Sequence, residues 1–307
     1  VLPWFVYSIS SALVFVNSSL LSFFEGCNSV AKVQKIRFKI AVLTSCVVLS
    51  GLFLKIKLFA LALSLIASAS LGSFLIYKNY KSLIIQLWKI SSVMFYSWKK
   101  EFLSLIWRYA LSWGSGYFIF QLFVPLTFKY YGTIDAGKIG FGISAWAAIL
   151  SISNIWLVSK IPYINILVAE NKLNNLIALL KNIFIKISVT YFCIGMSFLG
   201  CYFTFYQEFF LFKRFPIGII MCVLFVCNFL QLFINFLATY LRAHKKEPMA
   251  WASVLQGVFV TISTYYIVNH YSINYLFSGY LIGKVAVLIF TMYITYLQNK
   301  YDRRLFK

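Results

Sequence analysis

One lysine lies where a charge is energetically costly. Lys284 is near the middle of an apolar run, residues 272–297, directly after the pair Gly279-x-x-x-Gly283. If this run crosses a membrane, a charge at that depth costs roughly 2.5–3.5 kcal/mol on insertion scales, so we expect it to face a cavity or a partner. Such a cation could line a path for an anionic substrate. The alternative is a shifted span in which Lys284 snorkels to an interface or packs against helix carbonyls. The insertion cost favours the cavity.

Acidic side chains are too few and too scattered to indicate an active site. The chain has only seven Asp and Glu residues, and none lies in the middle of an apolar run. No nucleotide-binding loop, HExxH motif or GxSxG motif occurs. The six cysteines form no CxxC pair, so we expect no disulfide framework, no metal site and no cofactor. These observations predict a protein that is not an enzyme.

Seven further polar residues interrupt or border the apolar runs. The substrate-path candidates, besides Lys284, are Arg108, Gln121 and Asn154. The gating or steering candidates, which lie near the ends of runs and could attract an acidic head group, are Lys129, Asp135, Lys138 and Arg242. Each has a structural alternative, because charges at span ends serve as interfacial anchors and buried amides hydrogen-bond between helices.

The composition predicts a polytopic membrane protein of the all-α class. The 307 residues are 62% hydrophobic and 11% charged, whereas about a quarter of a soluble domain is charged. About nine runs are long enough to span a bilayer as helices. The predicted spans are 2–24, 38–54, 58–77, 105–128, 139–159, 184–206, 216–237, 251–269 and 272–297.

The basic residues predict how the chain is oriented. Of its 28 Lys and Arg residues, Lys284 lies inside a run and 21 lie at one set of run ends. The remaining six, at the opposite ends, are Lys55, Lys57, Lys129, Lys138, Lys213 and Arg214. The positive-inside rule therefore predicts a cytoplasmic C-terminus. The same rule accounts for the net charge of +21 without a nucleic-acid partner.

A basic segment predicts a division into two halves. Residues 78–104 intersperse Lys with Leu, Ile, Trp and Phe, a pattern typical of an amphipathic helix on the cytoplasmic leaflet. We expect it to link three spans in 1–77 to a six-helix bundle in 105–307. Residues 161–183 are predicted to lie along the same surface. Because the sequence starts without Met inside an apolar run, we also expect an N-terminal part to be missing.

Three parts of the sequence carry a family resemblance. Residues Ser22–Arg37 contain Glu25-Gly26 before a Val-x-x-Val-x-x-x-Arg run. The other two parts are Phe120-Gln-Leu-Phe-Val-Pro125 with Tyr131-Gly and Asp135-Ala-Gly137, and Tyr240-Leu-Arg-Ala-His-Lys-Lys-Glu-Pro248. Together they resemble bacterial O-antigen and polysaccharide flippases of the MATE-like MOP superfamily. The resemblance implies twelve helices in two bundles, of which the first three are absent here.

The resemblance also implies a function. A member of this family would move undecaprenyl-pyrophosphate-linked oligosaccharide across the bacterial inner membrane by alternating access, with proton antiport as one candidate coupling. Its partners would be that lipid-linked oligosaccharide, membrane lipids and, as candidates, a polysaccharide polymerase and a chain-length regulator. Two alternatives stay open: a multidrug exporter of the same superfamily, and a membrane-embedded polysaccharide polymerase. The first would be expected to carry a carboxylate within a span, and the second a larger outer loop.

Overall fold

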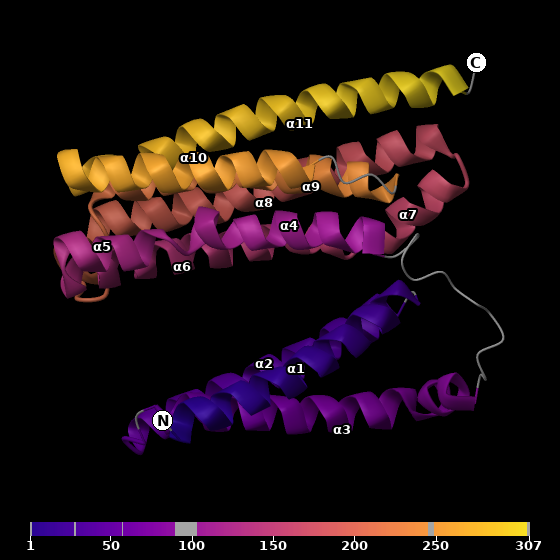
Figure 1. Ribbon diagram of the computed structural model, residues 1–307, viewed down its shortest axis with the longest axis horizontal. Coiled ribbons are helices and arrows are strands. Elements are labelled where there is room, and N and C mark those ends of the chain that lie inside the picture. The colour runs from indigo at the N-terminus through magenta and orange to yellow at the C-terminus, as the bar shows by residue number, and fades with distance from the viewer. Residues whose placement is uncertain (1, 28, 57, 90–102, 245–248, 306–307) are drawn as a thin grey trace. The chain divides into compact units, whose positions relative to one another are not determined.

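The computed structural model describes residues 2–27, 29–56, 58–89, 103–244 and 249–305, and within these ranges the regular structure is helical, with no strand. The chain divides into two compact units, Val1–Tyr96 and Ser97–Lys307, and the division falls inside the segment 78–104. Each unit is described by itself, with helices labelled as in Figure 1.

Unit 1 consists of three long helices, α1 (Leu2–Gly26), α2 (Val30–Phe53) and α3 (Phe59–Lys89). Helices α1 and α2 each pack mainly on α3. Phe24 is fully buried, and its ring stacks on that of Tyr80 with the centroids 3.9 Å apart. A buried amide also joins α1 to α3, because Asn17 donates from Nδ2 to the Ala69 carbonyl at 2.9 Å. The long apolar runs thus form helices, and a few interlocking side chains hold those helices together.

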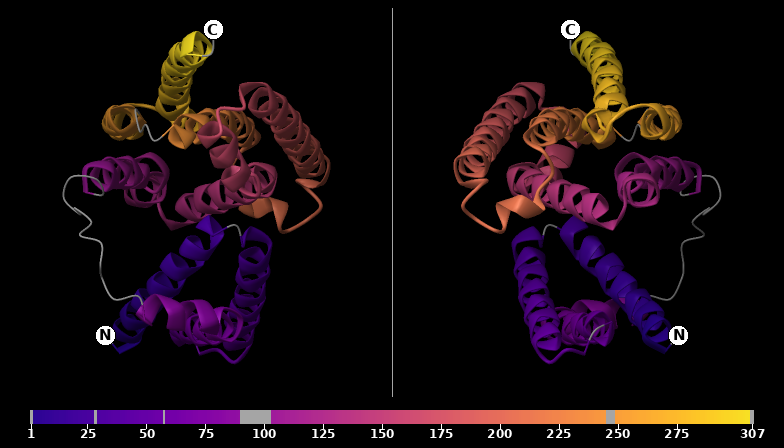
Figure 2. Two further views of the ribbon diagram at one scale, coloured as in Figure 1. Left: turned by 90° about the vertical axis from the view of Figure 1, so that its right-hand side faces the viewer. Right: turned by 90° about the vertical axis from the view of Figure 1, so that its left-hand side faces the viewer.

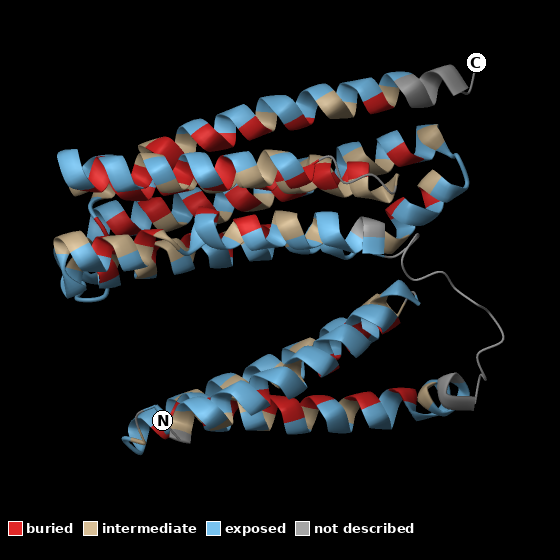
Figure 3. Cartoon of the chain, viewed as in Figure 1, coloured by how far each residue is buried: buried red, intermediate tan, exposed pale blue. Residues whose placement is uncertain are grey.

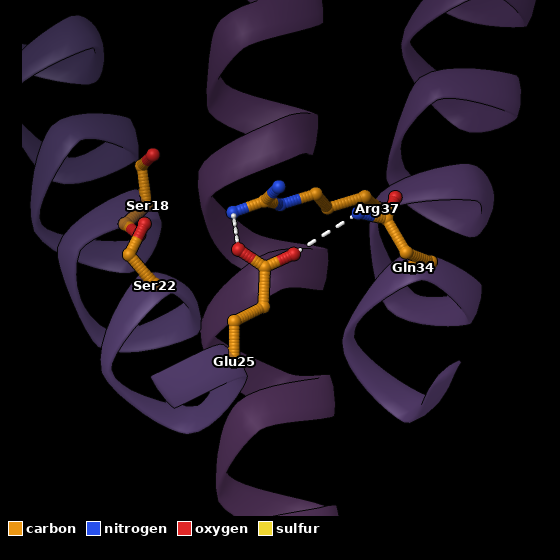
Figure 4. A network of polar contacts seen from close by, with 5 residues as sticks. All are labelled: Ser18, Ser22, Glu25, Gln34 and Arg37. Carbon is orange, nitrogen blue, oxygen red and sulfur yellow. Dashed lines mark hydrogen bonds and ion pairs between the residues drawn. The ribbon is translucent and has the colours of Figure 1, made fainter. Parts of the chain in front are cut away.

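An ion pair closes the turn between α1 and α2. The two oxygens of Glu25, in the last turn of α1, accept hydrogen bonds from Gln34 and Arg37 of α2, each at 3.0 Å (Figure 4). Nearby, Ser22 donates to the backbone carbonyl of Ser18 within α1. The segment from Glu25-Gly26 to Arg37, which the sequence indicated, therefore belongs to a helical hairpin whose two helices are joined by the Glu25–Arg37 ion pair.

Unit 2 is a helical bundle whose members lie alongside one another, as the two end-on views show (Figure 2). Its α-helices are α4 (Ser104–Phe120), α5 (Phe123–Tyr131), α6 (Thr133–Val158), α7 (Ile161–Ala169), α8 (Leu173–Phe205), α9 (Gly218–Ala243), α10 (Met249–His270) and α11 (Ser278–Leu305). Short 3-10 turns, Phe212–Arg214 and Ile273–Tyr275, precede α9 and α11. Helix α10 packs against α4 and α11, and α9 packs against α6 and α11.

Aromatic side chains form much of the core of unit 2. Trp146 of α6 is fully buried against Tyr191, Phe198 and Phe225. The Tyr191 hydroxyl donates to the Phe225 carbonyl at 2.7 Å. Gly195 of α8 allows close contact with α9, because a Cβ there would lie 2.8 Å from the Phe225 ring. This cluster fixes α6, α8 and α9, and α9 carries part of the candidate site.

Eight helices in the described ranges are long and apolar enough to cross a membrane. The remaining predicted span, 105–128, is instead divided into α4 and α5, with a break at Gln121 and Leu122. Pro125 explains the position of the break: it has no N–H for the carbonyl of Gln121, four residues earlier, and its ring clashes with that carbonyl. The sequence indicated a proline in this run but not where the helix would end.

Two predicted surface segments take part in longer helices. Residues 78–89 continue α3 past a kink at Tyr80, and residues 90–102 lie outside the described ranges. Of the segment 161–183, the first part forms α7 and the rest begins α8. Between them Lys172 pairs with Glu170 at 2.8 Å. The apolar runs therefore underestimate the lengths of α3 and α8.

Large apolar side chains are exposed along the helices of both units. Examples are Phe15 in α1, Trp113 in α4 and Leu255 in α10, with exposed fractions of 73%, 76% and 69%. Figure 3 shows exposed residues along the outer faces of the helices. Such surfaces are unfavourable in water and suit contact with lipid. The chain is an all-α polytopic membrane protein.

Candidate functional site

A cavity of about 350 Å³ lies between α4, α9, α10 and α11 of unit 2, and we call it the polar cavity because Gln, Asn, Ser, Lys and Arg side chains are among its lining residues. Its walls come from regularly spaced positions: Gln231, Asn235, Ala238 and Arg242 on α9, Met249, Ser253 and Gln256 on α10, and Lys284 and Val287 on α11. These spacings of three and four residues place each set on one face of its helix. The fourth wall is the C-terminal half of α4, up to Phe120 and Gln121.

Lys284 is the charged centre of this cavity. Its side chain is only 2% exposed, and its Nζ donates a hydrogen bond to Oε1 of Gln231. The ammonium also lies 4.6 Å from the ring centroid of Phe120 and 4.9 Å from that of Tyr280. Amide and aromatic groups stabilise a cation in an apolar environment, and cation–π contacts are stronger once water is excluded. None of these neighbours carries a negative charge.

Ion pairs in the described ranges lie away from the cavity. They are Glu25–Arg37 in unit 1 and Glu170–Lys172 between α7 and α8. The charge of Lys284 is therefore solvated by dipoles and rings, without a carboxylate partner among the described residues. A buried cation held in this way attracts an anion that can reach the cavity.

Helix α9 provides a polar stripe that leads away from Lys284. Gln231 donates from Nε2 to Oδ1 of Asn235 at 2.6 Å, so its amide joins Lys284 to the next turn of α9. Arg242 lines the far part of the cavity, and its guanidinium lies 5.6 Å from the Tyr109 ring centroid. At 1.5 Å per residue, the stripe from Gln231 to Arg242 is about 16 Å long, with the apolar Ala238 between Asn235 and Arg242.

The break after α4 brings its last residues to this site. Because α4 ends at Phe120, the Phe120 ring and Gln121 line the cavity. Two turns earlier in α4, the hydroxyl of Ser112 lies 3.2 Å from that of Ser253 in α10, and this contact joins the two helices. The C-terminal half of α4 therefore forms one side of the cavity.

Gln256 of α10 has an unpaired donor at the edge of the cavity. Its side chain is 6% exposed, and its Nε2 has no hydrogen-bond partner in the described structure. A buried donor without a partner typically costs about 1–3 kcal/mol. The residue lines the same cavity as Lys284. A ligand acceptor at this point would remove that cost.

The structure brings three of the sequence-predicted residues to one cavity. They are Lys284, Gln121 and Arg242. Arg108 is exposed on α4 and is not among the lining residues, and Asn154 lies on α6, where its Oδ1 is buried with no hydrogen-bond partner among the described residues.

The other three candidates surround the turn between α5 and α6. Lys129 lies over the Tyr130 ring at 5.4 Å, and Asp135 lies in the first turn of α6, where a carboxylate favours the helix dipole. Lys138 is half-buried on the next turn of α6. The turn itself needs Gly132, whose φ of 93° disfavours other residues.

Three amide residues that line the cavity, Gln231, Asn235 and Gln256, were not among the candidates predicted from the sequence. All three are amides inside apolar runs, the signal by which Gln121 and Asn154 were identified. The spacing of Gln231 and Asn235 also places them on one helical face. What the sequence lacks is the neighbour that each amide faces, because that depends on how α9, α10 and α11 pack.

The chemistry available here is anion binding by one ammonium group and several amides. No group of His, Cys, Asp or Glu residues that could hold a metal ion occurs in the described parts of the chain. Comparison with models of known protein families, with characterised proteins and with solved structures gave no match to this chain.

Proposed function

We propose that the chain is part of a membrane transporter that moves an anionic, lipid-linked oligosaccharide across a bacterial inner membrane. The observation that carries the proposal is Lys284, a buried cation in a polar cavity with no carboxylate partner among the described residues. A pyrophosphate would supply the missing negative charge. The sequence resemblance to polysaccharide flippases favours this class of substrate.

The polar stripe on α9 supports a path rather than an isolated site. It continues from Lys284 through Gln231 and Asn235 to Arg242, near the end of α9 that the charge distribution predicts to be cytoplasmic. A head group could reach Arg242 first and then exchange partners along the stripe. Amide groups between the two cations would also bind sugar hydroxyls, since they both donate and accept hydrogen bonds.

Complementation of a flippase-deficient bacterium tests this proposal. The gene is expressed as wild type, Lys284→Gln and Lys284→Arg, and surface polysaccharide and inner-leaflet lipid-linked repeat units are measured at matched protein levels. Loss of a charge-assisted hydrogen bond worth about 1.5–3 kcal/mol predicts roughly 10- to 100-fold less transport in Lys284→Gln. Lys284→Arg should retain part of the activity because it keeps the charge.

The matched control is Lys181→Gln, which removes an exposed lysine of α8. It should transport like wild type. Rescue by Lys284→Gln at the level of wild type would reject an anion-binding role for the lysine. Failure of the full-length wild-type gene in every matched host would reject the flippase proposal and favour the exporter.

A further inference from the structure

A second hollow, an apolar groove of about 420 Å³, lies between α10 and α11. It is lined by large side chains, among them Trp251, Leu255, Phe259 and Phe290, and most of these are well exposed. Gln256 is the polar exception among the lining residues. The groove therefore offers a surface for hydrocarbon, with one amide at its inner side.

Gly279 marks a close contact at one end of the groove, and Gly283 lies in the groove wall. A Cβ at Gly279 would lie 2.1 Å from Oγ of Ser263 on α10, so the two helices are in close contact there. Gly283 permits a second approach, to the side chains of Gln256 and Val260. Beyond Gly283 the two helices meet again, where Val287 packs with Met249 and the Thr291 hydroxyl lies 3.5 Å from the Met249 sulfur. The groove lies along the stretch of the helix pair between the Gly279 contact and the Met249 contact.

The groove and the polar cavity share two lining residues, Gln256 and Val287. They are thus adjacent spaces on either side of the Gln256 side chain, whose Nε2 has no partner in the described structure. A larger apolar groove of about 620 Å³, between α4 and α10, shares no lining residue with the cavity. Of the two grooves, the one between α10 and α11 borders the cavity that holds Lys284.

We infer that one amphipathic molecule occupies both spaces: its anionic head group binds Lys284 and the Gln256 amide, and its hydrocarbon chain lies in the groove between α10 and α11. This inference rests on the proposed function and adds where the lipid part of the substrate binds. The charge of Lys284 selects the head group, the apolar walls select the chain, and Gln256 marks the junction between them. In this arrangement the chain stays in an apolar environment while the head group is bound inside the bundle.

Photo-crosslinking of the purified chain in zwitterionic nanodiscs tests the placement. The probe is undecaprenyl phosphate with a diazirine in its hydrocarbon chain, and the competitors are undecaprenyl phosphate, undecaprenol and inorganic pyrophosphate. We expect labelled peptides at residues 251–259 of α10 and 282–290 of α11. Undecaprenyl phosphate should compete at least tenfold better than undecaprenol, because only the phosphate can pair with Lys284. Pyrophosphate, which has the charge but no chain, should compete weakly.

Two bulky substitutions distinguish the two grooves. Ala286→Trp fills the groove between α10 and α11, whereas Ala110→Trp fills the groove between α4 and α10. Labelling should fall at least tenfold in Ala286→Trp and change less than twofold in Ala110→Trp. Lys284→Gln should remove the preference for undecaprenyl phosphate over undecaprenol.

The outcomes separate this inference from the proposed function. Labels in the groove between α4 and α10, or unchanged labelling in Ala286→Trp, would overturn the chain placement, even if Lys284→Gln still abolished the preference for phosphate. A wild-type chain with no preference for the phosphate would overturn both proposals. The labelled peptides are mapped on the wild type, so this result does not depend on whether a variant folds.

Discussion

Single buried amides join the helices of this protein, and Asn17 provides the simplest test. Its Nδ2 donates to the Ala69 carbonyl, and its Oδ1 accepts from Ser73, so it joins α1 to α3. Hydrogen bonds between membrane helices contribute about 0.6 kcal/mol on average and up to about 1.7. Asn17→Leu keeps the number of side-chain heavy atoms and removes both bonds, so the free energy of unfolding should fall by about 1–2 kcal/mol, measured by unfolding in mild detergent.

Asn79 supplies the control for that experiment. Its exposed amide donates only to the Leu75 carbonyl one turn earlier on α3. Asn79→Leu should therefore change the unfolding free energy by less than about 0.5 kcal/mol. An equal loss of unfolding free energy in the two variants would show that the Asn17 hydrogen bonds do not stabilise the contact between α1 and α3.

The residue scale also shows what the sequence could and could not predict about the site. Lys284 was identifiable because a charge inside an apolar run is rare, and the structure buries it in a cavity. Gln231 and Gln256 carry a weaker signal, since an amide in a span is compatible with many helix contacts. Their importance depends on α9, α10 and α11 meeting at one depth, which no local pattern of the sequence encodes.

At the scale of elements, the contact between α10 and α11 depends on Gly279. A Cβ at this position would lie 2.1 Å from Oγ and 2.6 Å from Cβ of Ser263, but 3.9 Å from its Cα. We expect Gly279→Ala to destabilise unit 2 by about 1–3 kcal/mol, the usual cost of overpacking. The double variant Gly279→Ala/Ser263→Gly removes both clashing atoms and should recover most of that loss in a thermal unfolding measurement.

Gly137 of α6 is the matched position, because a Cβ there would meet nothing within 4 Å. Gly137→Ala should leave the stability unchanged or raise it slightly, as alanine favours helix. If Gly279→Ala were tolerated as well as Gly137→Ala, the result would contradict the close contact between Gly279 and Ser263 at one end of the α10–α11 groove.

Helix ends were the least predictable feature at this scale, for a physical reason. The predicted spans 58–77 and 184–206 correspond to α3, which ends at Lys89, and α8, which begins at Leu173. Hydropathy marks only the apolar part of a helix, whereas backbone hydrogen bonds continue into the interface, where Lys and Asn are well solvated. The break after Phe120 is the opposite case, because one proline interrupts an otherwise apolar run.

At the scale of the whole molecule, the sidedness of the chain determines which end of the cavity a substrate meets first. Helix α6 has 26 residues and is thus about 39 Å long, enough to cross a hydrocarbon core of about 30 Å. The charge distribution predicts that its start, near Lys138, is outside and that its end, near Lys160, is cytoplasmic. The same rule predicts that Arg242 of the cavity lies at the cytoplasmic side.

Cysteine labelling tests this orientation directly. In a background whose six cysteines are replaced by serine or alanine, Thr133→Cys and Ser159→Cys report on the two ends of α6, where both residues are exposed. A membrane-impermeant maleimide should label Thr133→Cys in right-side-out vesicles and Ser159→Cys only after permeabilisation. The reverse pattern would place Arg242 outside, and a head group synthesised in the cytoplasm would then meet the Lys284 end of the cavity first. Labelling of both sites without permeabilisation would mean that α6 does not cross the membrane.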